Sequence, residues 1–262
     1  MSLKGIIMTN KEILRIAMEQ SAIDLGARAE DFTKSENTVV ESVTDERARR
    51  YLKLPFSCQI VSYGSCAVAS VSEKCRTICE EYINKYPVEH LFETPNMQVL
   101  NDRLTDLGER ICFMAEYFLP DVNALRPLDC PYELKMLESR DFKELYLPQW
   151  SNALCEKRKE LDVLGIGAYD GGRLVGLAGC SADCDSMWQI GIDVLCDYRR
   201  QGIASALTSR LAVEIIERGK VPFYCAAWSN IRSVRNAIKS GFRPAWVEMT
   251  AKPCEFVDKM NE

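Results

Sequence analysis

The second half of the sequence alternates strand-like and helix-like runs in an order that few folds can accommodate. Residues 163–169 and 173–180 are typical of strands, and Asp170-Gly171-Gly172 between them is a strong hairpin signal. We expect further strands over 132–137, 187–195, 222–227 and 242–251, and helices over 141–159, 202–218 and 229–239. This order predicts an α/β (α+β) fold, in which a mixed, mostly antiparallel sheet is flanked by helices.

The first half carries weaker signals of the same kind. A helix is expected over 10–25, with Asn10 as N-cap and Gly26 as stop, and a second from Thr44 to before Pro55. Strands are expected over 59–64, 66–71 and 111–118, with helices over 73–85 and 100–107. Prolines frame a linker at 121–131, so we predict a smaller N-terminal α/β domain at 1–127 and a second domain at 128–262.

Composition excludes several classes of protein. The 262 residues are 47% hydrophobic, and the net charge of −5 argues against nucleic-acid binding. No apolar run approaches the roughly 18 residues that a membrane span needs. The twelve cysteines are scattered through apolar runs, which favours free thiols and a cytoplasmic location. With a single histidine, no metal is expected, and nothing indicates the oligomeric state.

The turn Arg199-Arg200-Gln201-Gly202-Ile203-Ala204 carries the clearest chemical signal. It follows a predicted strand and opens a long predicted helix, whose first N–H groups lack intrahelical partners. The helix dipole and two arginines add positive charge, and Gly202 lets a bulky anion approach the backbone. The turn therefore predicts a pyrophosphate cradle, although an ordinary helix start with solvated arginines fits the hexapeptide alone.

Two further features follow downstream. Asn230 ends the predicted strand 222–227 and could bond an amide-rich ligand or simply cap the next helix. Gly241 and Phe242 then end that helix and begin the last strand.

Taken together, residues 130–251 resemble the GNAT family, the GCN5-related N-acetyltransferases. The resemblance rests on the opening strand 132–137, the hairpin 169–176, the R-x-x-G-x-A pattern of Arg199, Gly202 and Ala204, and the stretch from Asn230 to Phe242. Residues 1–127 resemble half of such a fold without its turn, as a degenerate second copy would.

The resemblance implies a site for acetyl-CoA. The strand before the turn would be splayed from its neighbour, so that the pantetheine arm pairs with free backbone groups near Asp193. The turn amides would hold the pyrophosphate. The implied coenzyme contacts are Ile192, Val194, Arg199, Arg200, Gln201, Gly202, Ile203, Ala204, Ser205, Asn230 and Ser233.

The catalytic groups are less clearly indicated. A backbone N–H near Val194 is the expected oxyanion donor. Ala237 occupies the position of the family's usual tyrosine acid, so Tyr224 or Tyr198 would replace it, or water. Asp193 is the candidate base, although it could also be an edge charge held by solvent, and Glu248 is a further option.

The resemblance thus implies an N-acetyltransferase that moves an acetyl group from acetyl-CoA to a primary amine by direct attack in a ternary complex. A small-molecule amine is expected, but the sequence does not identify it. The missing tyrosine motivates an alternative, a non-catalytic acyl-CoA-binding or sensing protein.

Overall fold

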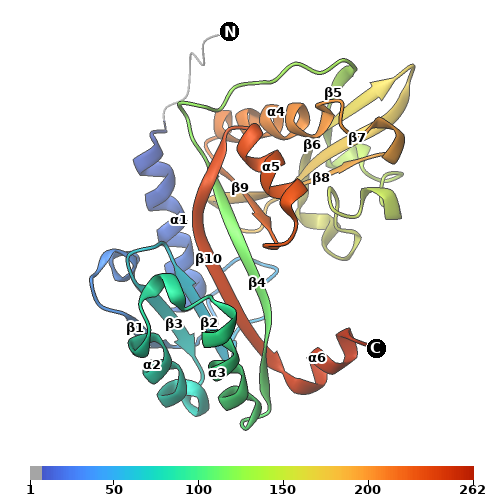
Figure 1. Ribbon diagram of the computed structural model, residues 1–262. Helices are drawn as coiled ribbons and strands as arrows, with labels where there is room; N and C mark the ends of the chain where they lie inside the picture. The colour runs from blue at the N-terminus through green and yellow to red at the C-terminus, as the bar shows by residue number, and fades with distance from the viewer. Residues whose placement is uncertain (1–7) are drawn as a thin grey trace. The chain divides into compact units, whose positions relative to one another are not determined.

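The computed structural model describes residues 8–262, which form two compact units (Figure 1). The first unit comprises residues up to Ile16 and 118–244, and the second comprises 17–117 and 245–262. This division differs from the expected boundary at residue 127, because β4 (Glu109–Pro120) and β10 (Phe242–Pro253) each contribute to both units.

The sheet of the first unit is mixed and mostly antiparallel, as predicted. After the end of β4, its order is β9 (Val221–Ala226), β8 (Met187–Val194), β7 (Arg173–Ser181), β6 (Asp162–Asp170) and β5 (Glu133–Glu138). Neighbours from β5 to β8 are antiparallel, and β8 pairs with β9 in parallel. The Asp170-Gly171-Gly172 hairpin is confirmed, and positive φ values of 53° and 89° at the two glycines explain the residue choice.

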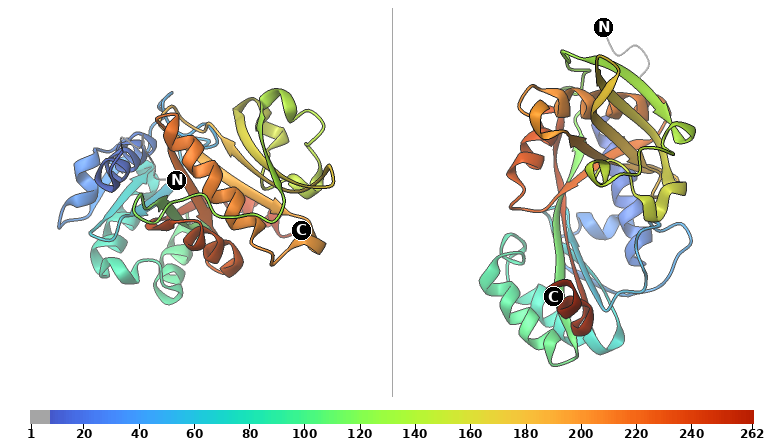
Figure 2. Two further views of the ribbon diagram at one scale, coloured as in Figure 1. Left: turned by 90° about the horizontal axis from the view of Figure 1, so that it is seen from above. Right: turned by 90° about the vertical axis from the view of Figure 1, so that its right-hand side faces the viewer.

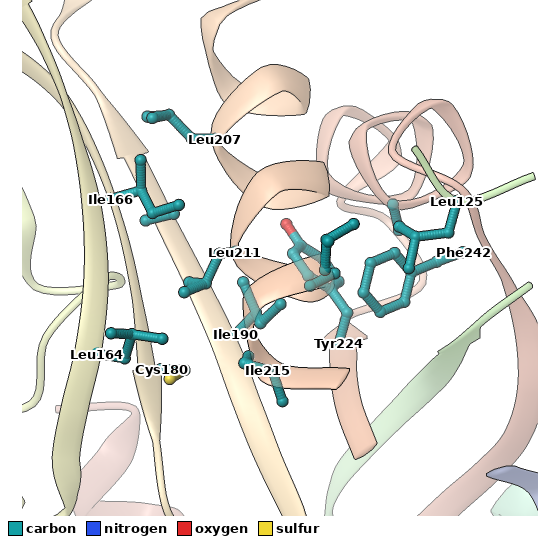
Figure 3. Close-up of a cluster of buried hydrophobic side chains, with 14 of the residues drawn as sticks. Leu125, Leu164, Ile166, Cys180, Ile190, Leu207, Leu211, Ile215, Tyr224 and Phe242 are labelled. Atoms are coloured by element: carbon teal, nitrogen blue, oxygen red, sulfur yellow. The ribbon is translucent and has the colours of Figure 1, made fainter. Parts of the chain in front are cut away.

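Helix α4 (Ile203–Glu217) lies along one face of β6, β7 and β8, with α5 (Ile231–Lys239) beside it (Figures 1 and 2). Leu207, Leu211 and Ile215 recur every four residues, so they share one helix face. Figure 3 shows these side chains pointing toward Leu164 and Ile190 of the sheet. Burial of this apolar stripe fixes α4, and with it the turn at its N-terminus, against the strands.

The predicted helix over 141–159 is wrong. The chain there makes three short 3-10 turns, η4 (Ser139–Asp141), η5 (Pro148–Trp150) and η6 (Glu156–Leu161). Two carboxylates accept hydrogen bonds from its backbone: Asp162 from the Cys155 N–H at 2.9 Å, and Asp193 from the amides of 152 and 153. These amides are thereby satisfied without a helix.

The second unit has the strand order β1 (Thr38–Glu41), β3 (Ala67–Val71), β2 (Cys58–Ser62), β10 and β4. Helices α2 (Arg76–Lys85) and α3 (Thr94–Thr105) lie on one side of these strands, and the C-terminal part of α1 (Asn10–Leu25) lies on the other (Figure 2). The remaining elements are η1 (Ala29–Thr33), η2 (Glu73–Cys75), η3 (Val88–His90), η7 (Cys196–Tyr198) and α6 (Cys254–Met260).

Two predictions for the N-terminal segment need correction. Helix α1 has the predicted bounds, but Thr9 is its cap: the Glu12 N–H donates to the Thr9 hydroxyl at 3.2 Å, and Asn10 instead bonds Asp121. No helix forms between Thr44 and Pro55. There the Arg49 N–H donates to the buried Asp24 carboxylate, 25 residues earlier, rather than to a helical carbonyl.

A buried ionic network fixes this loop in the second unit. Arg49 is 2% exposed, and its guanidinium bonds Asp24 and, at 3.2 Å, Glu248 of β10. Gln59 donates to the other Glu248 oxygen at 2.8 Å. Burial acts to lower the pKa of Arg49, but the neighbouring Asp24, Tyr51 and Glu248 outweigh it and raise that pKa well above its ordinary value. Arg49 therefore stays charged between two carboxylates.

Within residues 8–262, the helices are all too short or too polar to span a bilayer.

We predict that Arg49→Met destabilises the protein by about 3–5 kcal/mol, because it leaves two buried carboxylates without their cation. Arg47→Met is the matched control, since the Arg47–Asp45 ion pair is exposed to solvent and contributes little to stability. Urea unfolding of both variants measures the difference. Equal midpoints would show that the Arg49 network adds no stability.

Candidate functional site

Strands β8 and β9 separate within the first unit. Their parallel pairing joins Met187–Gln189 to Val221–Phe223. Over the described residues no further pair follows, although β8 continues to Val194 and β9 to Ala226. On its other edge β8 stays paired with β7 as far as Val194. The edge of β8 that faces β9 is therefore open beyond Ile190, from Gly191 to Val194, as the resemblance implied.

The open edge presents backbone hydrogen-bonding groups. The Leu195 N–H donates to the Val175 carbonyl on the β7 side at 3.0 Å. Because successive N–H groups of a strand point to opposite edges, the N–H groups of Val194 and Ile192 point toward β9. Such an edge can pair with an extended ligand that carries amides.

The turn after β8 has the conformation of an anion cradle. Arg200 and Gly202 have φ values of 64° and 85°, both left-handed. The first hydrogen bond of α4 runs from the Ala206 N–H to the Gly202 carbonyl, so the amides of residues 203–205 precede it. These N–H groups and the helix dipole favour an anion at this end. A Cβ on Gly202 would meet no protein atom within 4 Å, so its side faces open space.

Side chains around the turn hold it in place. Tyr132 donates to the Gln201 side chain at 2.8 Å, and Tyr198 donates to Asp170 of the hairpin at 2.9 Å. The Arg199 side chain returns to the Val194 carbonyl at 3.0 Å. The hydrogen bond to Asp170 raises the pKa of the Tyr198 hydroxyl. Tyr198, one candidate acid, is thus tied to the hairpin.

The coenzyme candidates inside α4 have different environments. Ile203 is buried in the core, and the buried Ser205 donates its hydroxyl to the Gly202 carbonyl at 3.0 Å. Ala204 between them is only partly buried. For Ile203 and Ser205, therefore, only the backbone N–H is available to a ligand.

Helix α5 follows β9, the strand on the other side of the opening, and packs beside α4. The Asn230 side chain accepts a hydrogen bond from the Ser233 N–H at 3.2 Å, which confirms the alternative role of Asn230 as the helix N-cap. The Ser233 hydroxyl is 2.7 Å from the Tyr224 hydroxyl. Tyr224 belongs to β9, one residue past the last pair with β8.

The Tyr224 hydroxyl lies at the face of α5 that also carries Ala237. Ser233 and Ala237 are four residues apart and share a face of α5. Ala237 is fully buried, and Tyr224 is 3% exposed within the apolar cluster of Figure 3. Burial raises the pKa of the Tyr224 hydroxyl, and its hydrogen bonds with Ser233 and Asn236 only partly oppose this. Tyr224 is therefore protonated at neutral pH and can donate.

Both carboxylate oxygens of Asp193, the candidate base, accept hydrogen bonds. One accepts from the Asn152 side chain at 2.7 Å, and the other accepts the N–H groups of Asn152 at 2.8 Å and Ala153 at 3.0 Å. These contacts indicate a structural role. The second candidate, Glu248, belongs to the other unit and is held there by Arg49 and Gln59.

Asn152 and Ala153 are absent from the predicted site residues, because the sequence pattern predicts a helix over them. One signal was present: glycines inside strands, at Gly179 and Gly191, often mark a close backbone approach. A Cβ at either position would overlap the carbonyl oxygen of Ala153 or Asn152, respectively.

A groove of about 340 Å³ lies at the opposite end of α4. Its polar lining includes Arg140 and Arg218, but each of these guanidiniums is paired with a glutamate. Neither the open edge of β8 nor the α4 N-terminus reaches it. The turn and the open strands remain the candidate site.

Comparison with known proteins shows the family of this chain. The family model described as GNAT acetyltransferase matches residues 78–245, more than half of the chain. No curated protein sequence matches. Similar solved structures include a GNAT-family protein from Novosphingobium aromaticivorans, with 21% identity and a TM-score of 0.42 over 55% of this chain and 66% of that one. A GCN5-related N-acetyltransferase-like protein from Streptococcus suis has 22% identity and a TM-score of 0.45 over 60% and 69%.

The family match spans the α2–β4 segment, the linker, the whole β5–β9 sheet and α5, and so contains the turn and the open strands. The order of these elements is the order that the sequence pattern predicted, apart from the missing helix after β5. The chain belongs to the GNAT acetyltransferase family.

Proposed function

We propose that this protein is an N-acetyltransferase that binds acetyl-CoA at the Arg199–Ser205 turn and along the open edge of β8. The observation that carries the proposal is the separation of β8 from β9 directly before a left-handed turn and a helix N-terminus. The open edge suits the two amides of the pantetheine arm, and the turn suits the pyrophosphate. Family membership supports acetyl-CoA as the donor.

In the proposed reaction, a neutral primary amine attacks the thioester carbonyl in a ternary complex. The carbonyl oxygen becomes an oxyanion, which the Val194 N–H at the open edge stabilises. The amine nitrogen loses a proton to water, because both oxygens of Asp193 are already engaged. The C–S bond then breaks, and the coenzyme thiolate takes a proton from Tyr224.

Tyr224 suits this last step because its hydroxyl is protonated at neutral pH and reaches the face of α5 that a tyrosine at position 237 would occupy. Ser233 can then orient the hydroxyl. We propose a small-molecule amine as the acceptor.

A second function is worth testing because Ala237 is buried and Asp193 is engaged. A protein with these features could bind acyl-CoA without catalysis, as a sensor.

Acetyl-CoA should bind the purified protein in the micromolar range, as measured by isothermal titration. Absence of binding to the folded protein would contradict both functions. Spermidine, kanamycin, L-lysine and a lysine peptide then serve as acceptors. Coenzyme release is followed by chromatography, because the twelve cysteines would react with thiol reagents. Binding without release on any amine would favour the sensor.

Gly202→Ala should weaken acetyl-CoA binding at least about tenfold, because the new methyl group points into the open space where the pyrophosphate would approach the backbone. Gly219→Ala is the matched control: Gly219 also has a positive φ and open space, but lies past the other end of α4. Both changes introduce similar strain, of about 1–2 kcal/mol. Equal affinities of the two variants would place the phosphates elsewhere. Arg200→Ala should cost less affinity than Gly202→Ala.

Tyr224→Phe should lower kcat about 100-fold and leave the dissociation constant of acetyl-CoA unchanged, because the hydroxyl acts on the leaving thiolate. Tyr198→Phe should leave kcat close to that of the wild type, since its hydroxyl is bound to Asp170. Steady-state kinetics with the best acceptor measures both variants. An unchanged kcat for Tyr224→Phe would remove this residue from the mechanism.

A further inference from the structure

The segment Trp150–Cys155 covers the face of β7 and β8 that is opposite α4. Ile190, Ile192 and Val194 pack toward the α4 cluster, so the alternating residues Gly191 and Asp193 face the other way. On that side Trp150, Ala153 and Leu154 are buried against Leu177 of β7 and Phe142. The segment is thus seated on the sheet by its own apolar side chains.

The backbone of this segment lies directly on two glycines. Any Cβ at Gly191 would overlap the Asn152 carbonyl oxygen, and any Cβ at Gly179 would overlap that of Ala153. Gly191 belongs to the part of β8 whose other edge is open. The carbonyl of Asn152 therefore lies over the open strand itself.

The Asp193 carboxylate fixes the position of the Trp150–Cys155 segment over the sheet. It accepts three hydrogen bonds, at 2.7–3.0 Å, from the Asn152 side chain and the N–H groups of Asn152 and Ala153. Charge-assisted bonds of this kind are stronger than neutral ones. Both oxygens already accept hydrogen bonds, so a proton taken up by Asp193 would disrupt the bonds that hold the segment.

We propose that Asp193 is a positioning residue, whose carboxylate holds Asn152 and Ala153 as a fixed wall over the open edge of β8, and that this wall sets the path of the amine acceptor. The proposal rests on the proposed function for the acceptor, but the wall itself is a property of the fold. A thioester lying in the opening has α4 and α5 on one side, which leaves the side of the wall for the amine.

The variant Asp193→Asn separates a positioning role from a base. An asparagine there can accept both backbone N–H groups with its amide oxygen. Its NH₂ group can donate to Asn152 once the Asn152 amide flips. Asp193→Asn therefore preserves the wall but removes the base, whereas Asp193→Ala removes both. Asn152→Ala removes one bond of the three and serves as a milder variant.

Hydrogen exchange followed by mass spectrometry tests the wall without any substrate. In peptides covering 148–155, Asp193→Ala should raise the exchange rate at least about tenfold, Asn152→Ala less, and Asp193→Asn by no more than about twofold. Unchanged exchange in Asp193→Ala would overturn the proposal.

Kinetics with acetyl-CoA and the best amine of the panel, or water when no amine reacts, test the role in the reaction. For Asp193→Ala we expect an acceptor KM about tenfold higher, or faster loss of the thioester to water, with a smaller change in kcat. Asp193→Asn should behave like the wild type. If Asp193→Asn instead lowers kcat about 100-fold or more while its exchange is unchanged, Asp193 is a base and the proposal is overturned.

Titration of the wild type with acetyl-CoA distinguishes failure of the proposed function from failure of the proposed role of Asp193. Absence of coenzyme binding would remove the proposed function and the acceptor path, while the exchange rates would still decide whether Asp193 holds the wall.

Discussion

The early end of the β8–β9 pairing is the constraint on which the candidate site depends. Parallel strands normally continue their ladder, because unpaired backbone groups are costly when buried. Here the ladder stops after Gln189 and Phe223, while β7 keeps the other edge of β8 fixed. The two strands therefore leave backbone donors exposed without losing their own position. Helix α4 packs on one face of β8, and the Trp150–Cys155 segment packs on the other. These contacts on both faces keep β8 in place beside the opening.

The parts of this site that local chemistry dictates can be predicted from the sequence. The Asp170-Gly171-Gly172 hairpin and the helix after Gly202 depend on glycine conformations and apolar periodicity, and both are confirmed. The turn also has the left-handed residues that a close ligand approach requires, although Arg200 supplies one of them in addition to Gly202. A helix N-terminus after a strand is a local feature, so its position could be predicted without the tertiary structure.

The errors occurred where distant side chains decide the local structure. Residues 141–159 have helical composition, yet carboxylates at 162 and 193 satisfy the amides of that loop. Similarly, the chain after Thr44 is held by Asp24 and Glu248, which lie 25 and 199 residues away from Arg49. In both segments, backbone N–H groups donate to carboxylates 7 to 41 residues away instead of to helical carbonyls. The same effect changes the interpretation of Asp193, since a carboxylate that looks catalytic in the sequence holds a neighbouring segment in the structure.

The central claim is that the coenzyme occupies the opening of β8 and the turn before α4. Backbone amide NMR during titration with acetyl-CoA tests this claim residue by residue. Occupation of the opening predicts the largest shifts at the N–H groups of Ile192 and Val194 and across residues 200–205, with small shifts at the Arg140–Arg218 groove. Shifts concentrated at that groove, with none at the turn, would contradict it.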